Sequence, residues 1–232
     1  MAVTLVTGGA GHLGQALASH FVEAGDDVHI VDQSPQVSQV AARLGCAGHQ
    51  IDLTDEGGLA ALAELAELDR LVCSVGAWPR SPWNQLSPKA WREVLATNLD
   101  SAYFSVRALT DALVKSSGSV VFVGSAIGLK GNPEMAHYAA AKAGLVGLAK
   151  SLALSLGPFG VRVNVVASGL IETPDADKTW TLEQREAMWQ QRAMQRALTI
   201  SEVVAPIVFL SSESASGITG QTLVVDGGVV FH

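Results

Sequence analysis

Short apolar runs that favour strands alternate with helical patterns from one end of the chain to the other. We expect strands at Val3–Thr7, Asp27–Val31, Gly48–Ile51, Arg70–Ser74, Ser119–Gly124, Arg162–Ala167 and Thr222–Val225. Several of these runs are continuously apolar, which is typical of parallel strands whose two faces are both covered. We expect helices between them at Leu13–Ala24, Pro35–Leu44, Glu56–Glu67, Trp91–Lys115, Met135–Leu156 and Ser201–Leu210. The alternation predicts an α/β fold, a doubly wound parallel sheet with right-handed crossovers.

The sequence shows no internal domain boundary. No linker rich in Pro, Gly or Ser and no repeat divides the 232 residues, so we expect a single domain over 1–232. One segment, at about 172–198, breaks the alternation because it is polar and carries Trp180 and Trp189. Long insertions in compact domains tend to be functional, so we predict a lid over a substrate; an ordinary surface helix is the alternative.

The charge balance excludes some classes of partner. The chain has 15 basic and 22 acidic residues, a formal net charge of −7, and no cluster of lysine and arginine. Neither nucleic acid nor an anionic membrane is therefore an expected partner. The longest apolar segment, Ala139–Gly157, is interrupted by Lys142 and Lys150, which predicts a buried helix and not a membrane span.

The cysteines and histidines give no sign of a metal site. Cys46 and Cys73 fit neither a disulfide framework nor a metal-ligand spacing, and the six histidines form no ligand-spaced pair. We expect reduced thiols and no metal. The N-terminus has no basic region or cleavage site, so the cytoplasm is the expected location.

A glycine-rich loop follows the first expected strand and leads into a helix. It reads Thr7-Gly8-Gly9-Ala10-Gly11-His12-Leu13-Gly14. Glycines there let the backbone approach a pyrophosphate, and the helix N-terminus offers N–H donors to its oxygens. Asp32 closes the second strand, where a carboxylate can accept hydrogen bonds from ribose hydroxyls and would repel a 2′-phosphate. The pattern predicts a dinucleotide site that prefers NAD(H) to NADP(H). The alternative to such a site is a plain glycine turn, with Asp32 capping the next helix.

Tyr138 and Lys142 lie four residues apart in an expected helix, and Ser125 precedes the tyrosine by thirteen positions. Residues at i and i+4 share one helix face, so the phenol and the ammonium can occupy one pocket. A nearby ammonium favours the phenolate, so we expect a phenol pKa below its usual value of about 10. A phenol tuned in this way, with a serine hydroxyl beside it, predicts proton transfer to or from an alcohol or carbonyl oxygen.

These features occur together with motifs that make the chain resemble the short-chain dehydrogenase/reductase family, in its compact single-domain branch. The remaining motifs are Asp52-Leu53, Thr97-Asn98-Leu99, Val163–Gly169, Ile171–Pro174, Ile218–Gln221 and Val225–Gly228. The resemblance covers essentially the whole chain. It implies a Rossmann-type seven-stranded sheet in the order 3-2-1-4-5-6-7.

The resemblance also implies a role for each matching residue. Tyr138 would be the general acid/base, Lys142 would lower its pKa and hold the nicotinamide ribose, Ser125 would orient the substrate oxygen, and Asn98 would anchor a water. The cofactor would contact Gly8, Gly11, His12, Leu13, Gly14, Asp32, Asp52, Leu53, Ser74, Val75, Gly76, Tyr138, Lys142, Ser168, Gly169, Ile171 and Thr173.

Three positions depart from the family pattern. His12 replaces the middle glycine of Thr-Gly-x-x-x-Gly-x-Gly, the segment Cys73–Gly76 replaces Asn-Asn-Ala-Gly, and Ser168 replaces a proline. A basic residue at the position of His12 resembles pteridine-reductase-like members that grip NADPH, but Asp32 argues against that cofactor. His12 packing neutrally beside the pyrophosphate is the simpler interpretation.

The residues expected to line a substrate pocket are Trp78, Ala126, Met135, Trp180, Met188 and Trp189. They suggest a cyclic or aromatic alcohol or ketone. His137 lies about 100° round the helix from Tyr138, so we interpret it as structural. The helix after Tyr138 is apolar on nearly every side, which predicts cover by another subunit, and the family resemblance favours a homotetramer over a homodimer.

The leading hypothesis is an NAD(H)-dependent oxidoreductase that interconverts a secondary alcohol and a ketone by hydride transfer. Two alternatives stay open. One is a pteridine-reductase-like enzyme that uses NADPH, and the other is a non-catalytic regulator that senses NAD.

Overall fold

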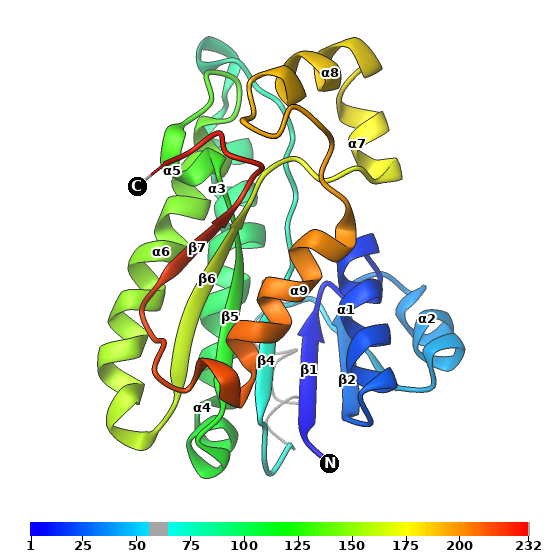
Figure 1. Ribbon diagram of the computed structural model, residues 1–232, viewed down its shortest axis with the longest axis vertical. Coiled ribbons are helices and arrows are strands. Elements are labelled where there is room, and N and C mark those ends of the chain that lie inside the picture. Colours follow the sequence, from blue (N-terminus) through cyan, green and yellow to red (C-terminus); the bar gives the residue numbers. More distant parts are fainter. Residues whose placement is uncertain (56–64, 232) are drawn as a thin grey trace.

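All seven strands form one parallel sheet in the order β3-β2-β1-β4-β5-β6-β7 (Figure 1). The computed structural model describes residues 1–55 and 65–231. The strands are β1 (Val3–Thr7), β2 (Asp27–Asp32), β3 (Ala47–Gln50), β4 (Arg70–Cys73), β5 (Ser119–Ser125), β6 (Arg162–Ser168) and β7 (Thr222–Val225). The predicted fold and strand order are confirmed, and no predicted strand end is displaced by more than one residue.

Helices cover both faces of the sheet (Figure 1). They are α1 (His12–Glu23), α2 (Val37–Leu44), α3 (Pro88–Leu95), α4 (Ser101–Ser116), α5 (Ile127–Lys130), α6 (Ala136–Leu156), α7 (Pro174–Thr179), α8 (Leu182–Gln190) and α9 (Ile200–Ser211). Phe122 on β5 packs in the core beneath α4 and α6, whereas its neighbours Val121 and Val123 pack in the core beneath α1 and α9. Successive strand residues point to opposite faces, so continuous apolar runs are needed where both faces are buried.

The predicted helix Trp91–Lys115 is interrupted. Helices α3 and α4 are joined by a π-helical turn at Ala96–Asp100, which contains Asn98. Turns of this kind often mark functional positions. Of the predicted helix Glu56–Glu67, residues 56–64 lie outside the described part of the chain.

The polar insertion forms two short helices, α7 and α8, above the carboxyl ends of the strands (Figure 1). The side chain of Thr173 caps α7, and Thr181 forms a reciprocal capping box with Gln184 at the start of α8. Such caps satisfy backbone N–H groups that have no partner within the helix. Arg185 on α8 forms ion pairs with Glu172 and with Asp177 on α7, which connect the two helices of the insertion.

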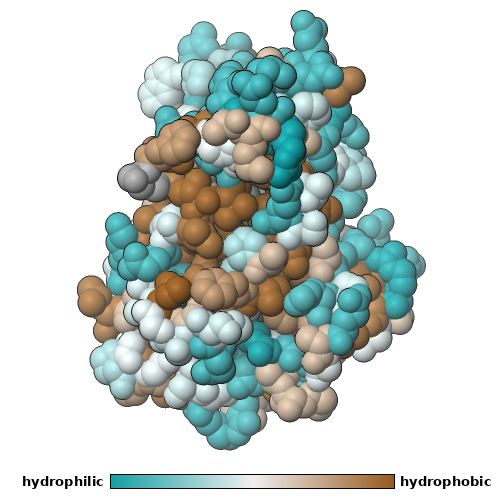
Figure 2. Space-filling view, in the orientation of Figure 1, coloured by the Kyte–Doolittle hydropathy of each residue, from teal (hydrophilic) through white to brown (hydrophobic). Residues whose placement is uncertain are grey.

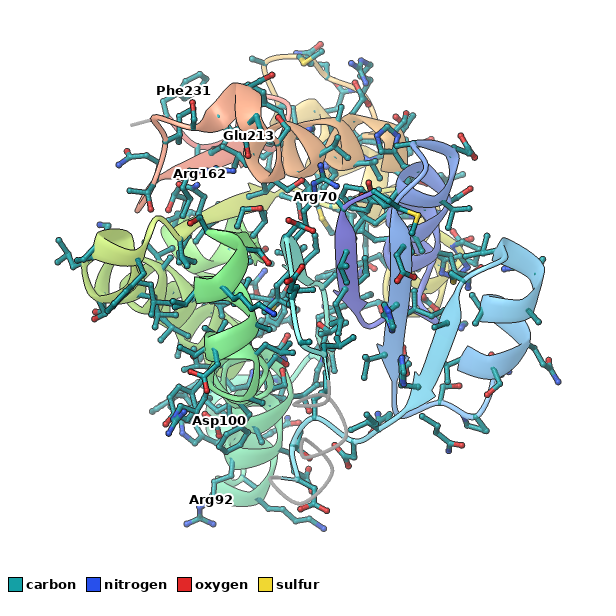
Figure 3. All side chains as sticks on the ribbon, turned by 90° about the horizontal axis from the view of Figure 1, so that it is seen from below. Arg70, Arg92, Asp100, Arg162, Glu213 and Phe231 are labelled. Carbon is teal, nitrogen blue, oxygen red and sulfur yellow. The ribbon has the colours of Figure 1, made fainter. Side chains whose placement is uncertain are left out.

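The opposite end of the sheet is tied together by arginines (Figure 3). Arg70 at the amino end of β4 pairs with Asp26, and Arg162 at the amino end of β6 donates to the carbonyl oxygens of Leu210 and Ser212. The amino ends of the strands are therefore held by these arginine contacts, whereas the carboxyl ends face the insertion.

Helix α6 buries one face only. Its inner face packs on the sheet and buries Lys142, whereas Leu154 is 82% exposed. By length and composition Ala136–Phe159 could span a membrane, but a core helix of this kind meets the same criteria. Figure 2 shows further apolar side chains over β7 and the C-terminal segment, where Leu223 and Phe231 are exposed. Cover by another subunit stays a prediction.

Candidate active site

A cavity of about 580 Å³ lies at the carboxyl ends of the strands, beneath α7 and α8. This is the edge where open α/β sheets bind ligands. Every residue expected to contact the cofactor lines the cavity, and so do Ser125 and five of the six expected substrate contacts. Asn98 and Trp189 do not line it.

The glycine loop is shaped by close backbone contacts. Gly8 has φ +70°, and a Cβ at Gly14 would lie 2.1 Å from the carbonyl oxygen of Gly8. The loop is closed by a hydrogen bond from the N–H of Gly11 to the same oxygen at 3.1 Å. Helix α1 begins at His12, so its first N–H groups lie at the cavity. This tight loop, which a Cβ at Gly14 would disrupt, fits the pyrophosphate of a dinucleotide.

Asp32 is held rigidly at the end of β2. One carboxylate oxygen accepts from the N–H of Ala10 at 3.0 Å, and the other accepts from the N–H of Ser34 at 2.9 Å. Carboxylate oxygens have further lone pairs, so Asp32 can still accept hydrogen bonds from a ligand. Asp52, whose Oδ1 accepts from Thr54, lies on the same wall of the cavity.

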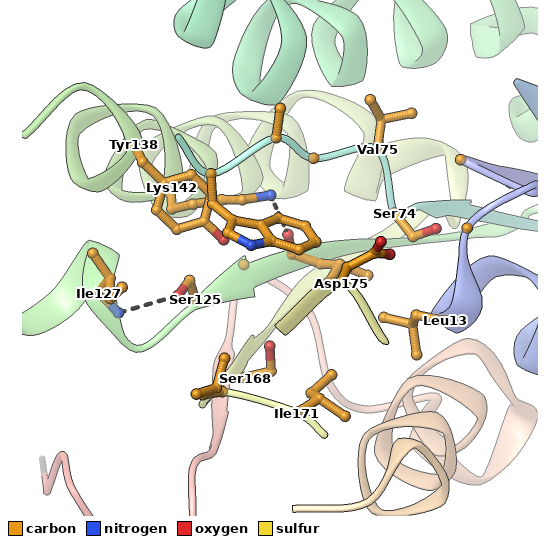
Figure 4. A pocket seen from close by; sticks show the side chains of 18 of the residues that line it. Leu13, Ser74, Val75, Ser125, Ile127, Tyr138, Lys142, Ser168, Ile171 and Asp175 are labelled. Atoms are coloured by element: carbon orange, nitrogen blue, oxygen red, sulfur yellow. Dashed lines mark hydrogen bonds between the residues drawn. The ribbon is translucent and has the colours of Figure 1, made fainter. Parts of the chain in front are cut away.

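The predicted catalytic residues Ser125, Tyr138 and Lys142 come together from two elements (Figure 4). Tyr138 and Lys142 lie on α6, and Ser125 ends β5. The Nζ of Lys142 donates to the carbonyl oxygen of Val123 at 2.9 Å and lies 5.6 Å from the centre of the Tyr138 ring. The hydroxyl of Ser125 accepts from the N–H of Ile127 at 3.2 Å, which orients it in the cavity.

Burial dominates the electrostatics of this group. It raises the pKa of Tyr138 to about 12, although a hydrogen bond with Ser125 acts in the opposite direction. It lowers the pKa of Lys142 to about 8. The expectation of a phenol pKa below 10 is therefore wrong for this arrangement. Burial removes water from the phenolate, and this penalty is larger than the stabilisation that the Lys142 ammonium provides. The ammonium is bound to the carbonyl oxygen of Val123.

Asn98 lies behind the cavity wall and is almost completely buried. Its amide nitrogen donates to the carbonyl oxygens of Ala77 and Val94, both at 2.9 Å, and its oxygen accepts from the N–H of Ala77. A Cβ at Gly76 would lie 3.2 Å from the Asn98 oxygen and 3.6 Å from the Nζ of Lys142. Asn98 thus fixes the chain after β4 beside Lys142.

The substrate end of the cavity is apolar. Met135, Tyr138 and Trp180 form a buried cluster, against which Trp78, Ile127, Leu170 and Met188 pack. The guanidinium of Arg80 lies 4.5 Å from the centre of the Trp180 ring and pairs with Glu134. The cation–π contact helps to fix the indole.

Two expectations about nearby residues differ in outcome. Trp189 does not line the cavity, since it lies about 100° round α8 from Met188, which does. Its indole nitrogen is buried without a partner among the described residues. His137, interpreted as structural, is fully buried away from the cavity.

Several lining residues were not anticipated. Lys130 and Asn132 lie between Ser125 and Tyr138 in the sequence, a proximity that could have revealed them. Asp175 and Arg192 lie within the insertion predicted at about 172–198, and Asp226 lies within the motif Val225–Gly228, but neither pattern singled out their side chains. All five line the cavity.

Comparison with known proteins agrees with the geometry. A family model described as enoyl-(acyl carrier protein) reductase matches residues 8–230. A solved oxidoreductase of the short-chain dehydrogenase/reductase family from Burkholderia thailandensis is 35% identical, with a TM-score of 0.91 over 99% of this chain and 92% of that one. The chain belongs to the short-chain dehydrogenase/reductase family.

Curated members of this family that the chain resembles differ in their substrates. The cis-4-hydroxycyclohexanecarboxylate dehydrogenase of Sinomonas cyclohexanicum is 37% identical, over 97% of this chain and 95% of the relative. The 3-oxoacyl-[acyl-carrier-protein] reductase FabG of Salmonella typhimurium is 34% identical, over 98% and 96%. This short-chain dehydrogenase/reductase is therefore an oxidoreductase of the nicotinamide-dependent class.

Proposed function

We propose that this short-chain dehydrogenase/reductase interconverts a secondary alcohol and a ketone with NAD(H) as the hydride carrier. The observation that carries the proposal is the position of Ser125, Tyr138 and Lys142. They lie on one wall of a cavity whose other end is the glycine loop with Asp32. A bound nicotinamide would supply or accept the hydride in that cavity.

The side chains divide the work at the substrate oxygen. In reduction, the hydroxyl of Tyr138 gives its proton to the carbonyl oxygen as that oxygen becomes an alcohol; in oxidation, the phenolate takes the proton back. The hydroxyl of Ser125 donates a hydrogen bond to the same oxygen. Lys142 keeps a positive charge beside the phenolate that forms, which reduces the cost of creating that charge in a buried site. Asn98 positions the loop next to Lys142.

The choice of NAD rests on Asp32. Its carboxylate is fixed at the end of β2 by two backbone amides, where it can accept from the ribose hydroxyls. A 2′-phosphate in the same place would face a fixed negative charge. A marked preference for NADPH would instead favour the pteridine-reductase-like alternative.

The apolar walls favour a substrate built on a ring. Trp78, Met135 and Trp180 present flat or flexible apolar surfaces next to Tyr138. The name of the Sinomonas relative describes an alcohol on a saturated six-membered ring, which is the size class we propose here.

The test is a panel of cyclic alcohols and ketones, followed by the absorbance of NADH. We expect turnover by the wild type and a loss of at least a thousandfold in kcat for Tyr138→Phe, since the proton donor is removed. NADH affinity measured by fluorescence should change little. Full activity of Tyr138→Phe would refute the mechanism, and tight NAD binding without turnover on the whole panel would favour the non-catalytic regulator.

A further inference from the structure

The charged side chains that line the cavity differ in their partners. Its four carboxylates are all engaged by donors of the protein: Asp32 and Asp226 by backbone amides, Asp52 by Thr54, and Asp175 by His12 and Lys178. Within residues 1–55 and 65–231, the lining cations Lys130 and Arg192 have no carboxylate within 4.0 Å. Lys130 and Arg192 therefore have no ion-pair partner among the described residues that would compete with an anionic ligand.

Arg192 is the deeper of the two cations. It is 4% exposed, and its two Nη atoms donate to the carbonyl oxygens of Arg196 and Leu170, both at 2.7 Å. These acceptors satisfy the N–H groups but leave the positive charge without an ion pair, while Asp226 and Glu172 act on it from a greater distance. A buried cation of this kind favours an anion nearby.

Lys130 supplies the contact that Arg192 cannot. It is exposed and ends α5, the short helix that begins directly after Ser125 and Ala126. Its N–H bonds the carbonyl oxygen of Ala126 at 3.0 Å, so it lies one helical turn, about 6 Å, along the axis from Ala126. From that position the flexible ammonium of Lys130 can reach a substituent on the far side of a substrate ring whose oxygen is held at Ser125.

Asn132 adds a neutral donor beside Lys130. Its Oδ1 accepts from the N–H of Glu134 at 2.9 Å, which fixes the side chain. The amide nitrogen is then oriented away from that contact, and no described residue accepts a hydrogen bond from it. An ammonium and an amide donor together suit a carboxylate, whereas a phosphate usually collects more donors.

We infer that the substrate of this enzyme carries a carboxylate on an apolar ring, with Lys130 and Asn132 binding the carboxylate while the alcohol or ketone lies at Ser125 and Tyr138. The inference rests on the proposed function. The ring occupies the apolar cluster around Met135 and Trp180, and Lys130 makes the ionic contact with the carboxylate.

The experiment compares each of several cyclic and aromatic keto acids with its methyl ester, which has the same ring and ketone but no charge. We expect the wild type to reduce at least one acid with a kcat/KM at least tenfold above that of its ester. Lys130→Gln should abolish the preference and leave the kcat/KM of the ester unchanged, while Lys130→Arg should retain it. Lys150→Gln, which removes an exposed lysine of α6 outside the cavity, is the matched control.

Salt and binding measurements separate this inference from the proposed function. The KM of the acid should rise with NaCl in the wild type but not in Lys130→Gln, because only the former makes the ionic contact. Reduction of neutral ketones with no preference for any acid would overturn the carboxylate site and leave the proposed function standing. If no ketone is reduced, binding of the acids is measured by quenching of tryptophan fluorescence. Binding to the wild type and not to Lys130→Gln supports the carboxylate site. Equal binding to both proteins, or binding to neither, overturns it.

Discussion

The Nδ1 of His12 lies 2.9 Å from the Oδ2 of Asp175, and this hydrogen bond joins the glycine loop to α7, the first helix of the polar insertion. Both residues line the cavity, so the contact closes its rim above the position expected for the pyrophosphate. His12 is the residue that departs from the family pattern in the glycine loop. The hydrogen bond with Asp175 gives His12 a structural role, because it connects the glycine loop to α7.

Loss of this contact should speed the release of the cofactor. Asp175→Ala removes the acceptor, and since both side chains are more than a third exposed, we expect an effect of about 1 kcal/mol, roughly a fivefold faster dissociation of NADH. Stopped-flow fluorescence measures that rate. Lys178→Met is the control, because Lys178 binds the other oxygen of Asp175 without crossing the cavity. Equal dissociation rates in Asp175→Ala and the wild type would show that the contact does not retain the cofactor.

The glycine loop should tolerate a methyl group at one position and not at another. A Cβ at Gly14 would lie 2.1 Å from a backbone oxygen, whereas one at Gly11 would lie 3.3 Å from it. We expect Gly14→Ala to lower the free energy of unfolding by about 3 kcal/mol and Gly11→Ala by less than about 1 kcal/mol. Urea unfolding of the two variants checks this. Similar losses in both would mean that the loop relaxes freely.

Burial of Lys142 should make stability depend on pH in the alkaline range. Its pKa is lowered from 10.5 to about 8 by burial, so between these values the unfolded chain binds more protons than the folded one. The contribution of Lys142 to stability should therefore rise as pH increases from 8 to 10, and the cost of its buried ammonium, about 3 kcal/mol, is fully present below pH 8.

Lys142→Met removes that cost but also removes the hydrogen bond to Val123, worth about 1 kcal/mol. We expect the variant to be about 2 kcal/mol more stable than the wild type at pH 7, with the difference gone by pH 10. Urea unfolding at pH 7, 8.5 and 10 tests this, with the exposed Lys150→Met as control. A less stable variant at pH 7 would contradict the assigned cost.

The cofactor preference should depend on the charge of Asp32. Asp32→Ser removes the carboxylate, so we expect the ratio of kcat/KM with NADH to that with NADPH to fall at least tenfold. Asp32→Asn also removes the charge but keeps an acceptor for one of the two backbone amides, so the loop is disturbed less than in Asp32→Ser. An unchanged ratio in both variants would place the selectivity elsewhere.

The interrupted helix shows where sequence patterns stop being informative. The apolar spacing of Trp91–Lys115 predicts one continuous helix, but the chain widens into a π-helical turn at Asn98. The side chain of Asn98 holds the chain after β4, a contact between segments 21 positions apart. The spacing of apolar residues indicates only which residues share a helix face. It does not indicate a hydrogen bond to a distant segment of the chain.

The sequence by itself determined the sheet, the glycine loop and the residues that line the cofactor end of the cavity. The order of the strands followed from the family resemblance. The first three depend on local chemistry: continuous apolar strands, glycines that only a tight turn requires, and fixed spacing on one helix face. The tertiary structure decided the raised pKa of Tyr138, the position of Trp189 outside the cavity and the contact between His12 and Asp175. It also left Lys130 and Arg192 without an ion pair among the described residues. Each of these depends on burial or on a partner from a distant segment, and both come into existence only when the chain has folded.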